Sequence, residues 1–327
     1  MLRIGTIGSG RIVDEFLAGL AGVCDLLHTA VYSRTVERAA EYAALRGVDN
    51  AFTDLQKMAE SDCIDAVYIA SPNALHVEQS ELFLRHGKHV LCEKPVAARP
   101  AELEGLQALA REKGVVFMEA IMCLYQPQLR LLREAVAQLG PVSVADFRFC
   151  QYSHQYPAYL RGELPNIFNP AMETGGLTDL GIYGMYPALC LFGEPQEITA
   201  RAGFLKSGAD VAGTVLLSYP DKTVTVTYSK SGQGAAPSEI VGENGTLLIG
   251  KISQLHDITF VHRDGTRTPL HGSEPKPLLM AREGAALCRF AEDLQCEEYR
   301  ENSALALEVC RALERARQSA GIRFPRD

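Results

Sequence analysis

A short apolar run that ends in an acid, a base and a proline is the first candidate for chemistry. Residues His89–Cys92 predict a buried strand, and Glu93, Lys94 and Pro95 follow it directly. In an open α/β sheet, charged residues at the carboxyl end of a strand face the crevice where ligands bind. Proline lacks a backbone N–H and restricts the backbone conformation of the residue before it, so the backbone that carries the Lys94 side chain would be stiff. Taken alone, the pattern also fits a surface Lys–Glu pair, and it does not decide whether the Lys94–Pro95 bond is cis.

The second candidate is a carboxylate and a phenol one helical turn apart. The glycine pair at 175–176 leads into a predicted helix that carries Asp179 and Tyr183 on one face. A free tyrosine hydroxyl has a pKa of about 10, so it needs a nearby cation to act as a base near neutral pH. Lys94 is the candidate cation, and Asp179 would accept a hydrogen bond and tune the pair. The alternative makes Asp179 a charge at a helix N-terminus and Tyr183 a core aromatic residue.

The start of the chain places a glycine turn between a strand and a helix. Leu2–Ile7 is apolar, and Asp14–Leu20 has the spacing of an amphipathic helix. Two glycines in the turn match the first two of a dinucleotide fingerprint, where they permit a tight turn and bring the backbone close to pyrophosphate. Val13 stands at the third position, which predicts a helix slightly farther from the strand. The predicted phosphate-binding residues are Gly8, Ser9, Gly10, Arg11 and Ile12.

The end of the second strand predicts the cofactor. Ser33 and Arg34 follow the strand Leu27–Tyr32, and no acid occurs before Glu37. An NAD enzyme usually places Asp or Glu here to accept from the ribose 2′-hydroxyl. A carboxylate would repel a 2′-phosphate, whereas a guanidinium binds it through two hydrogen bonds. Ser33 and Arg34 therefore predict NADP(H), with NAD as the alternative; otherwise Arg34 only flanks the helix that begins at Val36.

A third turn lies at the carboxyl end of the strand Ala66–Ala70. Its residues Ser71, Pro72 and Asn73 are predicted to lie against the dinucleotide. His76 either contacts a phosphate or begins the next helix. Strands and helices alternate throughout this part of the chain, which predicts a parallel, doubly wound sheet.

The second half of the chain has a different pattern of apolar and polar residues. After a helix at Leu129–Leu139, several segments alternate apolar with polar residues, which is typical of an antiparallel sheet with one buried and one solvated face. Helices at Met280–Gln295 and Ser303–Ala320 close the chain. The predicted strands are Val142–Phe149, Ile198–Leu205, Val211–Tyr219, Thr223–Ser229, Thr246–Lys251 and Ile258–Arg263.

Composition limits the classes of function. With 327 residues, of which 47% are hydrophobic and 22% charged, the chain is long enough for two ordinary globular domains. A formal net charge of −8 argues against nucleic-acid binding, which depends on neutralising phosphates. Nine cysteines without a CxxC pair, and an N-terminus that enters a strand directly, predict a cytoplasmic protein with no membrane association. His86 and His89 lack a cysteine or carboxylate cluster, so no metal site is predicted.

Three segments together resemble the Gfo/Idh/MocA oxidoreductase family. They are the glycine turn, the Ser71-Pro72-Asn73 turn with His76, and the stretch Gly87–Pro95, whose Glu-Lys-Pro end is the most specific. The likeness extends over essentially the whole chain. It is nearest the branch of dimeric dihydrodiol and xylose dehydrogenases and uncharacterised bacterial members.

The resemblance implies roles for residues in both halves. The segment Gly-Gly-x-x-Asp-x-Gly-x-Tyr of this chain resembles the family motif, which favours Lys94, Asp179 and Tyr183 as catalytic residues. We also place Glu93 and Lys94 among the cofactor-binding residues. The family's second domain is an open, largely antiparallel sheet whose exposed face often forms a dimer interface, so a homodimer is implied.

One position departs from the branch. Relatives generally have an arginine near the nicotinamide where this chain has Leu124, so a less cationic pocket is implied and the substrate of that branch is in doubt. Tyr152, His154, Tyr156 and Tyr159 are candidate compensations, because aromatic faces with hydroxyl rims suit a sugar or cyclic diol. An interface or loop role fits them equally.

The sequence therefore predicts an α/β protein with a Rossmann domain at 1–122 and an α+β domain for substrate binding and dimerisation at 123–327. The predicted function is NADP(H)-dependent hydride transfer between nicotinamide and a secondary alcohol or carbonyl of a sugar, polyol or cyclic diol. Two alternatives stay open: a non-catalytic NADP-binding regulator of the same fold, and an NAD-assisted glycosidase.

Overall fold

The structure, a computed structural model, describes residues 1–23 and 25–327, so Cys24, one of the nine cysteines, lies outside the described residues. The chain forms two compact units. Met1–Met122 and Pro275–Ala304 make the first, which we call the N-unit. Cys123–Glu274 and Leu305–Asp327 make the second, the C-unit.

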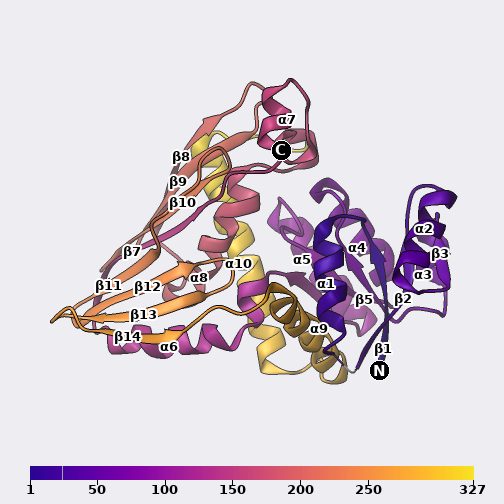
Figure 1. Ribbon diagram of the computed structural model, residues 1–327, viewed down its shortest axis with the longest axis horizontal. Coiled ribbons are helices and arrows are strands. Elements are labelled where there is room, and N and C mark those ends of the chain that lie inside the picture. Colours follow the sequence, from indigo (N-terminus) through magenta and orange to yellow (C-terminus); the bar gives the residue numbers. More distant parts are fainter. Residues whose placement is uncertain (24) are drawn as a thin grey trace. The chain divides into compact units, whose positions relative to one another are not determined.

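The N-unit contains a six-stranded parallel sheet in the order β3-β2-β1-β4-β5-β6 (Figure 1). This is the strand order of doubly wound dinucleotide-binding folds, in which the order reverses between β1 and β4. The prediction of a parallel, doubly wound sheet is confirmed, while the short strands β3 and β6 were not predicted. The strands are β1 (Leu2–Ile7), β2 (Leu26–Tyr32), β3 (Asn50–Phe52), β4 (Ala66–Ile69), β5 (His89–Glu93) and β6 (Phe117–Ala120).

Helices connect these strands and cover the sheet. Right-handed crossovers place helices before and after the reversal point on opposite faces. Gly19 lies where α1 and α9 touch, because a Cβ atom there would be 2.3 Å from the carbonyl oxygen of Pro277. Val13 is fully buried in α1, so the valine at the third fingerprint position packs within the core. The helices are α1 (Arg11–Leu20), α2 (Val36–Arg46), α3 (Leu55–Glu60), α4 (His76–Arg85), α5 (Pro100–Lys113) and α9 (Lys276–Glu292).

The C-unit contains an eight-stranded sheet in the order β14-β13-β12-β11-β7-β10-β9-β8. All neighbouring pairs are antiparallel except β7 with β10, so the predicted, mainly antiparallel sheet is confirmed. The strands β11 and β14 were not predicted. The strands are β7 (Val142–Cys150), β8 (Glu197–Phe204), β9 (Asp210–Ser218), β10 (Thr223–Ser229), β11 (Ser238–Gly242), β12 (Gly245–Lys251), β13 (His256–His262) and β14 (Arg267–His271).

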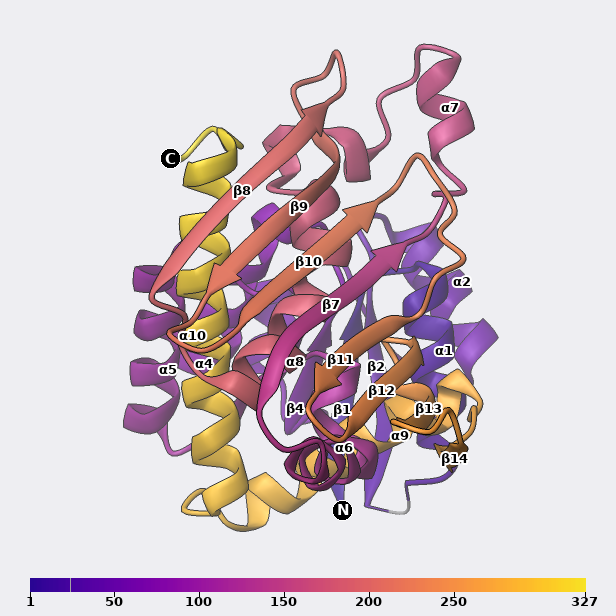
Figure 2. The ribbon, with the colours of Figure 1, turned by 90° about the vertical axis from the view of Figure 1, so that its left-hand side faces the viewer.

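Helices cover one face of this sheet. Figure 2 shows α8 (Ile182–Phe192) and α10 (Glu297–Ala320), whose residues from Leu305 on belong to this unit, behind the strands, whereas no α-helix of the described C-unit crosses the near face. A Cβ atom on Gly184 of α8 would lie 2.7 Å from Val226, which shows how closely this helix packs on β10. The remaining helices of the C-unit are α6 (Pro127–Gln138) and α7 (Tyr156–Leu160). None of the described helices is long and apolar enough to cross a bilayer.

Candidate active site

The glycine turn after β1 has two glycines with different constraints. Gly8 has a φ of +123°, and a Cβ atom there would lie 2.6 Å from the carbonyl oxygen of Ala70, so the fold itself requires glycine. Gly10 has an ordinary φ of −86°, and a Cβ atom there would meet no atom of the described protein within 4 Å. Gly10 precedes α1, and no side chain caps this helix. The open space and the uncapped N–H groups form a surface suited to an anionic phosphate.

The neighbouring strands bring three more predicted turns to the same edge of the sheet. β1 lies between β2 and β4, and β5 follows β4, all parallel. The carboxyl ends of parallel strands lie at one edge, so the turns after β2, β4 and β5 lie beside the glycine turn. These turns carry Ser33 and Arg34, Ser71 to Asn73, and Glu93 and Lys94, respectively.

Arg34 is exposed at the end of β2. Ser33 donates its backbone N–H to Phe52 at 3.0 Å, which fixes the chain just before Arg34. The helix that follows has its own cap, because Thr35 accepts from the backbone N–H of Arg38. Among the described residues Arg34 makes no ion pair, so its guanidinium is available to an anionic ligand.

His76 begins α4 and is buried, with 1% of its surface exposed. Its ring nitrogens lie 2.8 Å from the carbonyl oxygen of Ser71 and 2.9 Å from that of Pro95. The ring therefore ties the turn after β4 to the segment after β5. His76 is the first residue of α4, and both of its ring nitrogens bond to carbonyl oxygens of the protein.

The backbone around Lys94 is fixed on both sides. The Lys94–Pro95 bond is cis. Pro95 accepts from the ring of His76, and the N–H of Val96 donates to the buried carboxylate of Glu119 at 2.8 Å. These contacts hold the segment after Lys94 against α4 and β6.

Glu93 is bound from within the N-unit. The hydroxyl of Tyr68 donates to its carboxylate at 2.5 Å. Burial raises the pKa of Glu93, while Lys94 and the hydrogen bond from Tyr68 act in the opposite direction. Tyr68 is fully buried and stacks on Phe16 at 4.1 Å between ring centroids. The buried Tyr68 therefore fixes the carboxylate of Glu93 to the core of the N-unit.

Asp179 and Tyr183 lie on a modified helix in the C-unit. The segment Leu177–Gly181 is a π-helical turn that runs into α8, whereas the sequence predicts an ordinary helix. Such turns are rare and occur frequently at functional sites. Tyr183 is partly exposed, and its ring contacts the edge of Phe149 at 5.5 Å between centroids.

The two glycines before this turn are required by packing. A Cβ atom on Gly175 would lie 1.9 Å from the carboxylate of Asp210, and one on Gly176 would lie 2.7 Å from the ring of Tyr228. Asp210 is buried and accepts from the N–H of Leu177 at 2.7 Å, so it holds the start of the π-helical turn. Burial raises the pKa of Asp210.

Lys230 is a residue that sequence reasoning missed. It follows β10, it is buried, and its ammonium forms an ion pair and hydrogen bond with Asp179. A signal was present in the sequence: Val224, Val226 and Tyr228 are buried on one face of β10, and position 230 continues that period of two. A lysine on the buried face of a strand needs an anionic partner.

The predicted catalytic residues are therefore divided between the units. Lys94 lies in the N-unit with its hydrogen-bonded turns, and Asp179 and Tyr183 lie in the C-unit with Lys230. Within the C-unit, a cation, a carboxylate and a phenol are carried by the ends of β10 and α8. This set can hold a substrate hydroxyl and move a proton.

The remaining predicted residues lie in the C-unit as well. Leu124 is buried, with 7% of its surface exposed. Tyr156 stacks on Tyr159 at 6.2 Å and contacts Tyr152 edge-on at 5.7 Å, while His154 is exposed. The three tyrosines thus form one aromatic group around α7.

Two family models match the chain. Residues 2–121 match the model described as "Oxidoreductase family, NAD-binding Rossmann fold", and residues 129–248 match the Gfo/Idh/MocA C-terminal domain. The chain is 41% identical over 327 residues to the scyllo-inositol 2-dehydrogenase (NADP(+)) IolU of Bacillus subtilis, covering 100% of this chain and 99% of that protein. It is 31% identical over 258 residues to the mouse trans-1,2-dihydrobenzene-1,2-diol dehydrogenase, covering 77% and 75% of the two chains.

A solved structure has the same fold. The 3-ketoreductase KijD10 of Actinomadura kijaniata, crystallised with NADP and TDP-benzene, superposes with a TM-score of 0.86 at 24% identity and covers 98% of each chain. At this identity the likeness concerns the fold.

The parallel sheet, its glycine turn and the charged strand ends define a dinucleotide-binding oxidoreductase. The chain belongs to the Gfo/Idh/MocA oxidoreductase family, as the resemblance in its motifs predicts.

Proposed function

We propose that this protein is an NADP(H)-dependent dehydrogenase of a cyclic polyol or diol. The observation that carries the proposal is the 41% identity, over the full chain, to an NADP-dependent scyllo-inositol dehydrogenase. The end of β2 supports the choice of NADP, because Arg34 is exposed and no carboxylate lies between it and Glu37. The reaction would transfer hydride between nicotinamide and a secondary alcohol or its ketone.

Each part of the chain has a proposed task. Residues 1–122 would bind the cofactor, and residues 123–327 would bind substrate and form a homodimer through the C-terminal sheet. The helix-free face of that sheet supports the dimer (Figure 2). A cytoplasmic location is proposed because the eight described cysteines are all free thiols, as a reducing compartment favours.

The cofactor would lie along the carboxyl edge of the parallel sheet. Its pyrophosphate would be bound by the N–H groups at Gly8 to Ile12, and its 2′-phosphate by Ser33 and Arg34. Ser71, Pro72, Asn73, Glu93 and Lys94 would line the remainder, with His76 fixing the turns. When bound, NADP supplies the acceptor for hydride.

The chain's own residues would handle the proton. In oxidation, Tyr183 would accept the hydroxyl proton of the substrate, and Lys94 would favour the tyrosinate by its charge when the two units bring these side chains together. In reduction, the same groups would stabilise the developing alkoxide and return the proton. The Asp179–Lys230 pair would orient the substrate hydroxyl, because Asp179 keeps part of its carboxylate exposed.

The test is a fluorescence titration of the purified protein with NADPH and NADH, followed by an oxidation screen over inositols, aldoses and cyclic diols with NADP. We expect tighter binding of NADPH and turnover of at least one cyclic polyol. Tight binding without turnover of any substrate would favour the non-catalytic regulator. Release of sugar from a glycoside without net consumption of cofactor would favour the glycosidase.

A further inference from the structure

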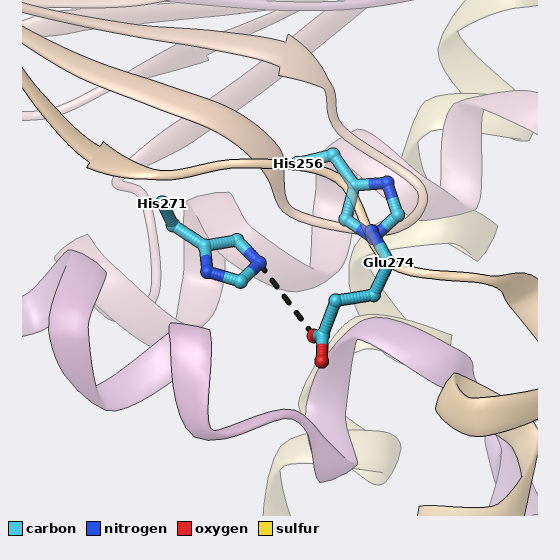
Figure 3. A group of neighbouring side chains, drawn as sticks. All are labelled: His256, His271 and Glu274. Carbon is cyan, nitrogen blue, oxygen red and sulfur yellow. Dashed lines mark hydrogen bonds and ion pairs between the residues drawn. The ribbon is translucent and has the colours of Figure 1, made fainter.

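A group of two histidines and a glutamate lies at one end of the C-unit sheet, apart from all residues assigned above. His256 begins β13, His271 ends β14, and Glu274 follows three residues later. One potential ligand atom from each residue lies within 4.8 Å of the others. Figure 3 shows the two rings and the carboxylate directed toward one another.

The hydrogen bonds reveal where the lone pairs of both rings point. The amide nitrogen of Gln128 can only donate, and it lies 2.9 Å from Nε2 of His271, so this ring nitrogen accepts. The backbone N–H of Glu274 donates to Nε2 of His256 at 3.2 Å. The carboxylate of Glu274 lies 3.6 Å from Nε2 of His271. Two imidazole lone pairs and a carboxylate therefore share one small volume.

Gln128 supplies the independent observation. Its side chain is buried, with 4% of its surface exposed, and its amide nitrogen serves both His271 and Glu274. Its amide oxygen has no hydrogen-bond partner in the described chain, although such groups are normally satisfied when buried. The amide nitrogen of Gln128 therefore holds His271 and Glu274 beside one another.

A purely hydrogen-bonded cluster is the simpler alternative. In the described chain it gives the two ring nitrogens no role beyond accepting one hydrogen bond each. To bind a metal, His256 would exchange its 3.2 Å bond from Glu274 for coordination.

We propose that His256, His271 and Glu274 bind one divalent transition-metal ion of the Zn²⁺ type, with water as the fourth ligand. Imidazole nitrogens with carboxylate oxygen suit Zn²⁺, which prefers four ligands in a tetrahedron. Hard cations such as Mg²⁺ prefer oxygen ligands and would bind weakly here.

The ion would have a structural effect on the C-unit. It would link the first residue of β13 and the last residue of β14 to the segment that carries Glu274. Glu274 is also the last residue before the chain passes from the C-unit to the N-unit at Pro275. A metal there would fix the end of this connection.

The experiment measures zinc binding by the full-length protein. The protein is stripped with a chelator, dialysed, and titrated with ZnCl₂ by calorimetry, with MgCl₂ as a comparison. The variants are His271→Gln and Glu274→Gln, at positions that are only partly buried. The matched control is His262→Gln, an exposed histidine on the same strand as His256 whose ring hydrogen-bonds to Thr268.

We expect one Zn²⁺ per chain, a loss of affinity of at least tenfold in His271→Gln and in Glu274→Gln, and none in His262→Gln. Zinc in large excess over the Kd should raise the melting temperature of the parent by several degrees and leave both variants unchanged. Stoichiometric binding that survives in His271→Gln and Glu274→Gln would point to cysteine thiols and overturn the proposal. Absence of binding by the parent would overturn it as well.

Discussion

Lys230 and Asp179, which are 51 positions apart, form an ion pair within the C-unit. The side chain of Lys230 is 5% exposed and that of Asp179 is 27% exposed. The ammonium is therefore enclosed while part of the carboxylate faces outward. Because the ammonium of Lys230 compensates its charge, the carboxylate of Asp179 can orient a substrate hydroxyl without leaving an unpaired negative charge in the site.

We predict that Lys230→Met lowers kcat by about 10- to 100-fold, because Asp179 loses the partner that fixes its orientation. Steady-state kinetics with a cyclic polyol and NADP measure the effect. A melting curve on the same sample separates it from unfolding. The double variant Lys230→Met/Asp179→Asn tests the pairing: its loss should be smaller than the two single losses multiplied together. Multiplicative losses would mean that the residues act independently.

Lys94→Met should lower kcat by about 10²- to 10⁴-fold, the usual range for removing a group that assists proton transfer. Its fluorescence titration with NADPH should stay close to that of the parent, because the backbone turns hold the cofactor. Lys57→Met, at an exposed position of α3, is the control and should be fully active. Near-normal turnover of Lys94→Met would refute the role proposed for this lysine.

Gly10→Ala and Gly8→Ala should separate cofactor binding from folding. A methyl group at Gly10 meets no protein atom within 4 Å and needs no unusual backbone angle. This variant should therefore melt as the parent does, but bind NADPH at least tenfold more weakly, since the methyl occupies the space proposed for pyrophosphate. At Gly8 the methyl would clash with the backbone of Ala70, so Gly8→Ala should be destabilised. Unchanged NADPH affinity in Gly10→Ala would contradict the proposed position of the cofactor.

Arg34→Ala should reduce the preference for NADPH over NADH by about tenfold or more, because a charged hydrogen bond to the 2′-phosphate is lost. The ratio of the two kcat/KM values is the measurement. Arg38→Ala is the control, since Arg38 is an exposed arginine on α2, the helix that follows Arg34. An equal loss with both cofactors would indicate that Arg34 does not distinguish them.

Glu283 should make stability depend on pH. This residue of α9 is buried, and burial raises its pKa well above the ordinary value of 4.5, with a further contribution from Glu93. Above pH 4.5 the unfolded chain loses this proton while the folded chain keeps it, so the free energy of unfolding falls as pH rises toward the folded pKa.

Glu283→Gln removes the loss of stability that the raised pKa of Glu283 causes as pH rises. The variant should therefore have a higher melting temperature than the parent at pH 7 to 8, where each unit of pKa shift corresponds to about 1.4 kcal/mol. The difference in melting temperature between variant and parent should disappear below about pH 4, where Glu283 is protonated in both the folded and the unfolded parent. Melting curves across this range measure it, and Glu292→Gln, at an exposed position of the same helix, is the control. A difference that does not change with pH would refute the explanation.

Local patterns were sufficient to predict much of this protein. The strand, glycine turn and helix at the N-terminus depend on neighbouring residues alone, and β1, α2 and β10 begin and end where the sequence predicts. The period of two in the second half likewise predicts a sheet with one buried face, because adjacent side chains on a strand point in opposite directions. The family resemblance rests on motifs of the same local kind.

Tertiary structure decided what local patterns cannot express. The short strands β3, β6, β11 and β14 are stabilised by their neighbours in the sheets rather than by their own composition. The Lys230–Asp179 pair and the group of His256, His271 and Glu274 depend on which strand ends and helices come together. Strand order and register set those distances, and they follow from packing across the whole unit, because residues far apart in sequence carry no local signal of their partners.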